Sequence, residues 1–423
     1  MGATLDFAER LWNGDAVIDS GHQLFVDGDL EPLTDDVAFI PSFANVSAIR
    51  TPDGLVLVDT GSEMFATTIH QKIRAWSDQR LNTAVYSHGH IDHVFGVPVF
   101  EAEAADNGWP APQVVAHEAM PARFDRYKLT NGYNAVINQR QFQIPGLKWP
   151  MNYRYPDVTY RAALTMSVGG TTVELHHARG ETDDHTWTWL PEHRTLCCGD
   201  LFIWASPNAG NPQKVQRYPL EWARACREMA ALGAELLLPG HGVPIVGAER
   251  VKTALLDTAE LLQTLHDQAV ELMNAGARLD ELIHTVRAPQ HLLDKPYLQP
   301  VYDEPEFVVR NVWRLYGGWY DGNPANLKPA AEAALARELA DLAGGAGTLA
   351  DRANALASAG DDDSLRLAGH LAELAALAAP DDAGVHAARA EVFKRRTEAA
   401  TSTMAKGVFA WAAAESAKRT AGD

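Results

Sequence analysis

The stretch Ser87-His88-Gly89-His90-Ile91-Asp92-His93 places three imidazoles and one carboxylate within six residues. This mixture of nitrogen and oxygen ligands suits zinc or a similar divalent ion. Gly89 allows a tight loop in which the flanking histidines converge. The alternative is a polar turn on the surface, which seldom gathers so many ligand types. The spacing therefore predicts a metal site.

The residues before this loop indicate how it is positioned. Residues 83–86 are short, β-branched and apolar, which predicts a buried strand. The loop then follows the carboxyl end of a strand, where α/β proteins place their chemistry. Residues 36–58 alternate apolar and polar positions and predict three more strands. The third of these ends at Asp59, for which two roles stay open: a hydrogen bond to a metal-bound histidine, or a cap for a helix over 62–78.

Further strands are predicted over 114–117, 172–177, 187–190, 195–200 and 235–238, with a helix over 220–232. Three of them lead to potential ligands, namely Glu181, Asp200 and His241. A lone histidine after Pro-Gly is an ordinary loop residue, but several strand ends with ligand-type side chains favour one shared site. Between these strands, residues 118–160 show no clear periodicity and predict an irregular segment. Its polar and aromatic residues suit either a pocket wall or a solvated loop: Tyr133, Asn134, Asn138, Arg140, Trp149, Tyr153 and Tyr155.

After about residue 250 the composition becomes helical. Residues 251–275 have helical periodicity, 288–306 predict a crossing segment, and the aromatic-rich 307–320 are expected to be buried. From residue 328 the chain is rich in alanine and leucine, with breaks predicted at 344–345, 360–361 and 380–381. These helices resemble degenerate tetratricopeptide-type hairpins without the strict repeat signature. They predict a domain for assembly rather than chemistry.

The composition excludes some classes of function. The 423 residues carry a formal net charge of -19, which argues against nucleic-acid binding, because such binding needs clustered Lys and Arg. The three cysteines form no disulfide framework and suit a reducing compartment. No signal peptide is visible, and no apolar run approaches the roughly 18 to 20 residues that span a bilayer. We expect a soluble, cytoplasmic protein.

The order of the motifs over residues 36–245 resembles the metallo-β-lactamase fold: strand-Asp-x-Gly, His-x-His-x-Asp-His, Gly-ligand-Thr, Gly-Asp and Pro-Gly-His. The resemblance implies an α/β fold, an αββα sandwich, followed here by an all-α helical domain. It also implies two Zn²⁺ ions per chain. The first would be held by His88, His90 and Glu181, the second by Asp92, His93 and His241, with Asp200 bridging both.

Two features resemble the alkyl sulfatase branch of that superfamily. Most of the superfamily has histidine where this chain has Glu181, whereas alkyl sulfatases have glutamate there and a bridging acid nineteen residues later, here Asp200. That branch usually has glutamate as the bridging acid, so Asp200 is a mild departure. Residues 310–327, with Gly318-Trp319-Tyr320-Asp321-Gly322-Asn323-Pro324-Ala325, resemble the stretch that opens the alkyl sulfatase dimerisation domain. The resemblance implies a catalytic domain over 1–255, a connection over 256–327 and a dimerisation domain over 328–423, hence a homodimer.

The ligand Glu181 alters the charge of such a site. Two Zn²⁺ would be neutralised by three carboxylates and a bridging hydroxide, where a histidine in place of Glu181 would leave one positive charge. Arginines near a sulfate ester should then matter more. Arg217, similar to the family's Arg before Asp-Pro-Leu, is the candidate, and a surface charge beside a helix is the alternative. The candidate catalytic residues are Asp92, His185 and Arg217, with His185 either a proton donor or a strand cap. Phe202 and Trp204 suit an alkyl channel or the core equally.

The resemblance therefore predicts a zinc-dependent hydrolase that cleaves alkyl sulfate esters, a small-molecule substrate class, to alcohol and inorganic sulfate with a metal-activated water. The sequence does not choose between attack at sulfur and attack at carbon. One rival is another hydrolase of the same fold, acting on a lactone, thioester or phosphoester. A rival of a different class is a helical scaffold whose first domain has lost its activity.

Overall fold

The computed structural model describes residues 2–18 and 24–421. Its first part contains two mixed β-sheets. The seven-stranded sheet has the order β1-β2-β3-β4-β5-β6-β7, and the six-stranded sheet has the order β13-β12-β11-β10-β9-β8. The strands of the first sheet are β1 (Glu31–Pro32), β2 (Val37–Ile40), β3 (Val46–Thr51), β4 (Gly54–Val58), β5 (Leu81–Val85), β6 (Gln113–His117) and β7 (Val158–Tyr160). Those of the second are β8 (Ala163–Val168), β9 (Thr171–His177), β10 (Thr186–Leu190), β11 (Thr195–Ile203), β12 (Leu236–His241) and β13 (Ile245–Val246).

The helices that join and cover the sheets are α1 (Ala3–Trp12), α2 (Ala66–Trp76), α3 (Val97–Asn107), α4 (Met120–Leu129), α5 (Asn131–Phe142), the 3₁₀ turn η1 (Pro191–His193), α6 (Pro219–Ala230), α7 (Ala248–Asn274), α8 (Leu279–Thr285), α9 (Gln290–Leu293) and α10 (Pro305–Tyr316). The later helices are α11 (Pro324–Leu327), α12 (Glu332–Ala343), α13 (Ala346–Ala359), α14 (Asp362–Ala378), α15 (Ala383–Ala399) and α16 (Thr403–Ala421).

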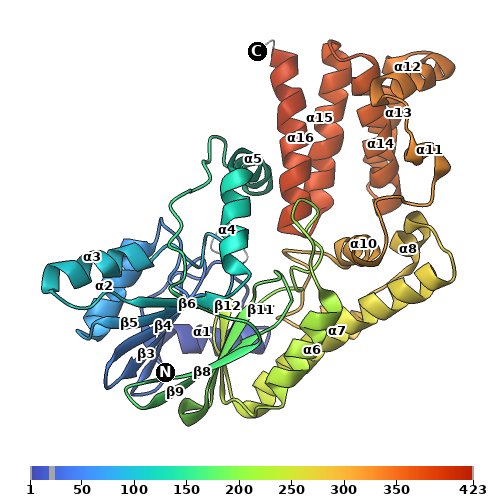
Figure 1. Ribbon diagram of the computed structural model, residues 1–423. Coiled ribbons are helices and arrows are strands. Elements are labelled where there is room, and N and C mark those ends of the chain that lie inside the picture. Colours follow the sequence, from blue (N-terminus) through green and yellow to red (C-terminus); the bar gives the residue numbers. More distant parts are fainter. Residues whose placement is uncertain (1, 19–23, 422–423) are drawn as a thin grey trace. The chain divides into compact units, whose positions relative to one another are not determined.

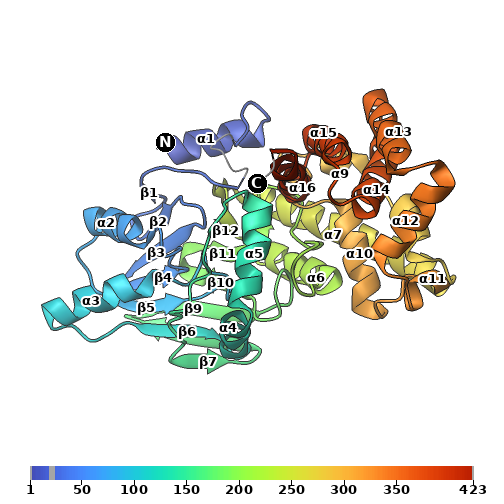
Figure 2. The ribbon, with the colours of Figure 1, turned by 90° about the horizontal axis from the view of Figure 1, so that it is seen from above.

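Two apolar cores hold the layers of the sandwich together. Between the sheets, Phe39, Val56 and Val115 of the first sheet pack with Leu175 and Leu238 of the second, all of them buried. A second core joins the outer face of the six-stranded sheet to α6 and α7. Figure 2 shows α2 and α3 beside the seven-stranded sheet, with α6 and α7 on the side of β10 to β12. The predicted αββα sandwich is confirmed.

The parallel strand pairs determine where the loops with the candidate site residues lie. β4, β5 and β6 run parallel, and β11 runs parallel to β12. The carboxyl ends of neighbouring parallel strands meet at one sheet edge, so the loops that follow β4 and β5 come together there. The strand pairs β4 with β5 and β11 with β12 can be followed in Figure 1.

The chain divides into two compact units. One runs up to residue 131 and continues over 149–318, and the other contains 132–148 and the residues from 319 onward. The second unit is all-helical, and its helices α12, α13 and α14 end near the predicted breaks at 344–345, 360–361 and 380–381. α5 belongs mainly to it, and the Gln143 side chain that follows α5 donates a 2.7 Å hydrogen bond to the carbonyl of Gly407.

Two sequence-based expectations about these segments are wrong. Residues 118–160 are not irregular throughout, because α4 and α5 occupy much of this stretch. On α4, Met120, Phe124 and Tyr127 are buried at helical spacing, a pattern that the surrounding charged residues obscure in the sequence. The aromatic-rich stretch 307–320 is only partly buried, since Trp319 is 74% exposed while Val308 and Val312 lie in the core.

Candidate metal centre

The structure brings all seven predicted ligands together in two groups. One group contains His88, His90, Glu181 and Asp200, and the other contains Asp92, His93 and His241. In each group the potential ligand atoms all lie within 4.8 Å of one another. The positions in the fold differ in one respect from expectation, because Asp200 lies inside β11 rather than at its end.

In the first group, two histidine nitrogens face one carboxylate oxygen. Nε2 of His88 lies 2.7 Å from Nδ1 of His90, and Oε2 of Glu181 lies 3.6 Å and 3.7 Å from these two nitrogens. Oδ2 of Asp200 is 3.8 Å from Nε2 of His88. Two imidazoles and two carboxylates at this spacing surround a position suited to a divalent cation.

In the second group, Oδ2 of Asp92 lies 3.7 Å from Nε2 of His93 and 3.5 Å from Nε2 of His241. Asp200 also faces this group, with Oδ1 3.5 Å from Nε2 of His93 and Oδ2 3.3 Å from Nε2 of His241. Since Asp200 approaches histidines of both groups, its carboxylate is placed to bridge two cations.

Buried atoms without hydrogen-bond partners test whether cations fit. Among the residues that the structure describes, Nε2 of His93, Oε2 of Glu181 and Oδ1 of Asp200 are buried without a hydrogen-bond partner. Buried polar atoms are normally paired. All three atoms point into the ligand groups, so divalent cations at these positions would satisfy them, and the residues present fit a dinuclear metal site.

The remaining ring nitrogens of three histidines are held by acceptors. Nδ1 of His93 lies 2.7 Å from Oδ2 of Asp59, Nδ1 of His88 lies 3.0 Å from the hydroxyl of Ser87, and Nδ1 of His241 donates to the carbonyl of Phe43. Such contacts fix the tautomer and leave Nε2 for a metal.

Asp59 has a φ of 60°, a left-handed conformation that few non-glycine residues adopt and in which aspartate is more frequent than most. Its Oδ1 accepts a 2.7 Å bond from the backbone amide of Ser87, at the start of the histidine loop. Helix α2 begins only at Ala66, so of the two roles open for Asp59 the structure supports the contact with His93.

The side chains of Asp184 and Arg123 lie so close to the backbone of residue 89 that only glycine fits there without displacing them. The Asp184 carboxylate accepts the backbone amide of Gly89 at 3.0 Å and pairs with Nε of Arg123 at 2.8 Å. A Cβ at position 89 would lie 2.7 Å from Cδ of Arg123, so a larger residue would displace the side chains that hold the loop.

The ligands differ in their affinity for protons. Burial lowers the pKa of both His88 and His90 well below the usual range, so both are neutral as metal ligands must be. Burial also opposes charge on His93, but Asp59 and Asp200 outweigh it and raise the pKa of His93 well above its usual range. Burial raises the pKa of Glu181 well above normal despite Arg217, whereas His241 and His93 overcome burial and hold the pKa of Asp200 well below normal.

Two other predicted site residues, His185 and Arg217, contact the candidate ligands without belonging to either ligand group. His185 stacks on His88, with ring centroids 4.8 Å apart, and its Nε2 accepts the backbone amide of Asp200 at 3.2 Å. Burial lowers the pKa of His185 to about 3, so its ring is neutral at ordinary pH. Arg217 is 1% exposed and contacts Glu181. Phe202 and Trp204 lie in the apolar core.

Lys214 is a candidate site residue that the sequence analysis missed. It is half-buried in the segment between β11 and α6, and its ammonium lies 5.5 Å from the centre of a Trp149 ring. Burial, followed by the charge of Arg217, lowers the pKa of Lys214 to about 8. Its charge is one of the smaller causes that lower the pKa of His90. The Trp149 ring that it faces neighbours Tyr127, whose ring is 6.4 Å from that of His90. The only signal in the sequence is its place three residues before Arg217.

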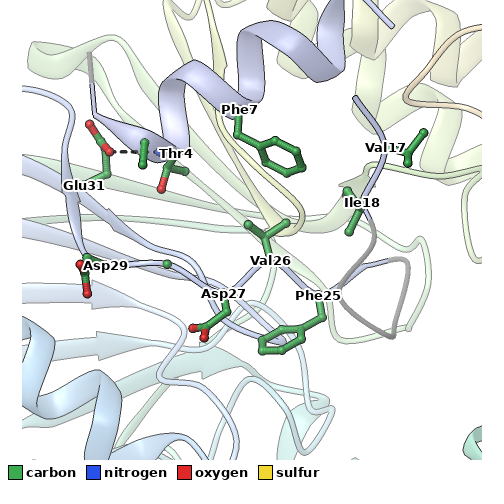
Figure 3. A pocket seen from close by; sticks show the side chains of 11 residues that line it. Thr4, Phe7, Val17, Ile18, Phe25, Val26, Asp27, Asp29 and Glu31 are labelled. Carbon is green, nitrogen blue, oxygen red and sulfur yellow. Dashed lines mark hydrogen bonds between the residues drawn. The ribbon is translucent and has the colours of Figure 1, made fainter. Parts of the chain in front are cut away.

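A pocket of ≈ 470 Å³ beside α1 contains none of these residues (Figure 3). Figure 3 shows Phe7, Phe25 and Val26 along it, with Asp27 and Asp29 at one side. It is separate from the metal centre.

Two family models match the chain. The model described as "Metallo-beta-lactamase superfamily" matches residues 40–241, and the model described as "Alkyl sulfatase dimerisation" matches residues 278–419. The first match contains all seven ligands. The second contains α10 and the helices of the second unit up to residue 419.

Proteins similar to this chain include a "Linear primary-alkylsulfatase" of Pseudomonas sp., 29% identical over 74% of the chain and 62% of that protein. An "(R)-specific secondary-alkylsulfatase" of Pseudomonas sp. is 27% identical over 75% of the chain and 52% of that protein. The chain thus spans less than two thirds of the length of these relatives. In fold, the chain is similar to the solved structure of a stereoselective inverting secondary alkylsulfatase from Pseudomonas sp., with a TM-score of 0.82 at 23% identity, covering 97% of the chain and 70% of that structure.

Proposed function

Because the chain belongs to the alkyl sulfatase branch of the metallo-beta-lactamase superfamily, we propose that it hydrolyses alkyl sulfate esters to an alcohol and inorganic sulfate, with two zinc ions. The observation that carries this proposal is the occurrence on one chain of two features. One is a seven-ligand centre in which Glu181 faces His88 and His90, and the other is a region that matches the alkyl sulfatase dimerisation family. The curated relatives named above support the substrate class.

Two zinc ions held by these ligands would supply Lewis acidity and a water whose pKa is lowered toward neutrality. The chain's own residues orient the ligands and attract the substrate. Asp59 and Ser87 hold the histidine loop, and Asp200 faces both ligand groups. We assign the attraction of a sulfate ester anion to Lys214, whose positive charge acts on His90 of the first group.

An aromatic wall lies next to the first ligand group. The ring of Tyr127 is centred 6.4 Å from that of His90, and the ring of Trp149 is centred 5.4 Å from that of Tyr127. Aromatic surfaces of this kind bury alkyl groups favourably. We assign the Tyr127 and Trp149 rings to the contact with the alkyl chain.

A panel of substrates tests the activity. Purified zinc-loaded protein is assayed for sulfate release from dodecyl sulfate and from a secondary alkyl sulfate, in parallel with lactones, thioesters and phosphoesters, and with chelator-treated protein as the control. We expect sulfate release that requires metal. If no alkyl sulfate of any chain length releases sulfate, the proposal is wrong. Hydrolysis of a lactone or thioester instead would assign the protein a different activity within the superfamily.

Isotope labelling separates the two modes of cleavage. In ¹⁸O-labelled water, attack at sulfur places the label in sulfate, whereas attack at carbon places it in the alcohol. Mass spectrometry of both products from a secondary alkyl sulfate decides between them.

We also propose a homodimer formed through the helical region. The match to the alkyl sulfatase dimerisation family supports it, as do the exposed leucines Leu335 and Leu342, which lie seven residues apart on one face of α12. The structure contains no helix among the described residues that is long and apolar enough to span a membrane. The cytoplasmic location stays a prediction.

Light scattering of the double variant L335E/L342E tests the dimer. We expect wild-type protein to have the mass of two chains and the variant to have the mass of one. The matched control is L256E, at another exposed leucine on α7 in the first unit. A monomeric wild-type protein at micromolar concentration would overturn the proposal.

A further inference from the structure

Arg217 lies against one of the proposed metal ligands. Its side chain is 1% exposed, and its Nη1 is 3.2 Å from Oε1 of Glu181. The same guanidinium also donates to the backbone carbonyl of Glu181. A buried arginine is stable only when it is paired and hydrogen-bonded, and here Glu181 supplies both the charge and the second acceptor.

The two carboxylate oxygens of Glu181 have different surroundings. Oε1 receives Arg217 and the side-chain amide of Asn208. Oε2 faces the nitrogens of His88 and His90 at 3.6 Å and 3.7 Å. The donors on Oε1 therefore fix the rotation of the carboxylate and direct Oε2 toward the position of the first metal.

Arg217 is in turn held by helix α10. The side-chain amide of Asn311 donates to the carbonyl of Arg217 at 3.0 Å, and its oxygen accepts the backbone amide of Arg217 at 3.3 Å. Asn311 is 2% exposed. It belongs to the region that matches the dimerisation family, yet it lies in the first compact unit together with the ligands.

The pairing also changes the charge of the first ligand group. A histidine ligand is neutral, whereas glutamate brings a negative charge to the metal. The positive charge of Arg217 at 3.2 Å offsets that negative charge. Glu181 and Arg217 together carry no net charge, as a histidine would.

We propose that Arg217, held in place by Asn311, is a positioning residue of the metal centre that orients Glu181 and offsets its charge. This role differs from the substrate-binding role expected from the sequence, and the two predict opposite results. A substrate-binding arginine affects KM and leaves the affinity for zinc intact. A positioning arginine affects the affinity for zinc itself.

Zinc affinity, measured by competition with a chromophoric chelator, tests the proposal without any substrate. We expect R217M to weaken binding at one of the two zinc sites about 100-fold, and R217K and N311A to weaken it about 10-fold, since loss of an outer partner typically costs roughly 10–100-fold. The control is R310A on the same helix, where the guanidinium pairs with Glu306, and its affinity for zinc should equal that of wild type. Circular dichroism checks folding, and if R217M does not fold, R217K and N311A decide the outcome.

A second background separates positioning from a general structural role. In E181H the ligand is neutral, so R217M should no longer weaken zinc binding. Likewise, N311A should have no added effect in R217M, because it acts through Arg217. Wild-type zinc affinity in R217M and N311A would overturn the proposal, as would an equal loss from R217M in the wild-type and E181H backgrounds. Absence of sulfatase activity in the wild-type protein would leave this result unaffected.

Discussion

The two halves of the candidate metal centre share histidines whose outer ring nitrogens meet acceptors, His88 in one half and His93 and His241 in the other, but they differ at Glu181. In the half with His93 and His241, the ligand rings donate to acceptors, namely the Asp59 carboxylate and the Phe43 carbonyl. In the half with Glu181, the ligand accepts from donors, namely Arg217 and Asn208. The type of group that contacts each ligand away from the metal position therefore depends on the charge of that ligand. A neutral imidazole binds metal better beside a hydrogen-bond acceptor, whereas a buried carboxylate needs a compensating cation.

The largest expected effect comes from removing a ligand of the first half. H90A should lose zinc at the first position, with an affinity loss well above the roughly 100-fold that an outer contact can cost, and should lose activity with it. Metal analysis after dialysis should fall from two zinc ions per chain to one. Full retention of both ions would show that His90 is not a ligand and would remove the basis for dividing the centre into these halves.

The next effect belongs to the second half. D59N replaces the acceptor on Nδ1 of His93 by a side chain of similar shape, and we expect zinc affinity at the second position to fall about 10–100-fold. The first position should keep its affinity. The chelator competition described for Arg217 resolves the two positions, and a loss confined to the first position would contradict the contrast between the halves.

A smaller effect is expected for the substrate rather than the metal. The ammonium of Lys214 is charged below its pKa of about 8, so an attraction for a sulfate ester is present below that pH and is lost as the pH rises through it. We expect the KM of wild-type protein to rise above about pH 8. K214R should keep a low KM to higher pH because arginine stays charged, and K214A should have a pH-independent KM about 10-fold higher, the equivalent of roughly 1.4 kcal/mol.

Zinc content serves as the control for Lys214. Because no ligand atom is removed, K214A should bind two zinc ions as tightly as wild type. If its KM matches that of wild type at pH 7, the sulfate is held by another group.

The smallest effect should fall outside the metal centre. Asp382 accepts the backbone amide of Val385 at 3.0 Å and caps α15 in the helical unit. D382A should lower the free energy of unfolding by about 1 kcal/mol, measured by urea denaturation, without changing zinc affinity. A change in zinc affinity would mean that the helical unit contributes to the metal centre.

Much of the site was predictable because its chemistry is local. Three imidazoles and a carboxylate fall within His88 to His93, and the parallel strand β5 that precedes them was recognisable from its apolar residues. The helix breaks at Gly344 and Gly360 were predictable as well, because helices commonly end at a glycine. In the structure both glycines adopt positive φ at the end of a helix. The helices α4 and α5 were not predicted, since their apolar positions are interrupted by charged and polar residues that packing alone makes compatible with burial.

The sequence by itself determined the types and order of the seven candidate ligands, because ligand spacing is a short-range pattern, and the resemblance of its motifs to the metallo-β-lactamase fold indicated the sandwich and the family. Only the tertiary structure decided which side chains hold each candidate ligand in place. Asp59 is 34 residues from His93, and Arg217 is 36 residues from Glu181 and 94 from Asn311. Contacts between residues so far apart in the chain produce no local pattern in the sequence. The residue type alone also does not show whether an arginine is buried or exposed. In the fold, Arg217, which the sequence offered as a candidate for binding substrate, pairs with Glu181, one of the proposed metal ligands.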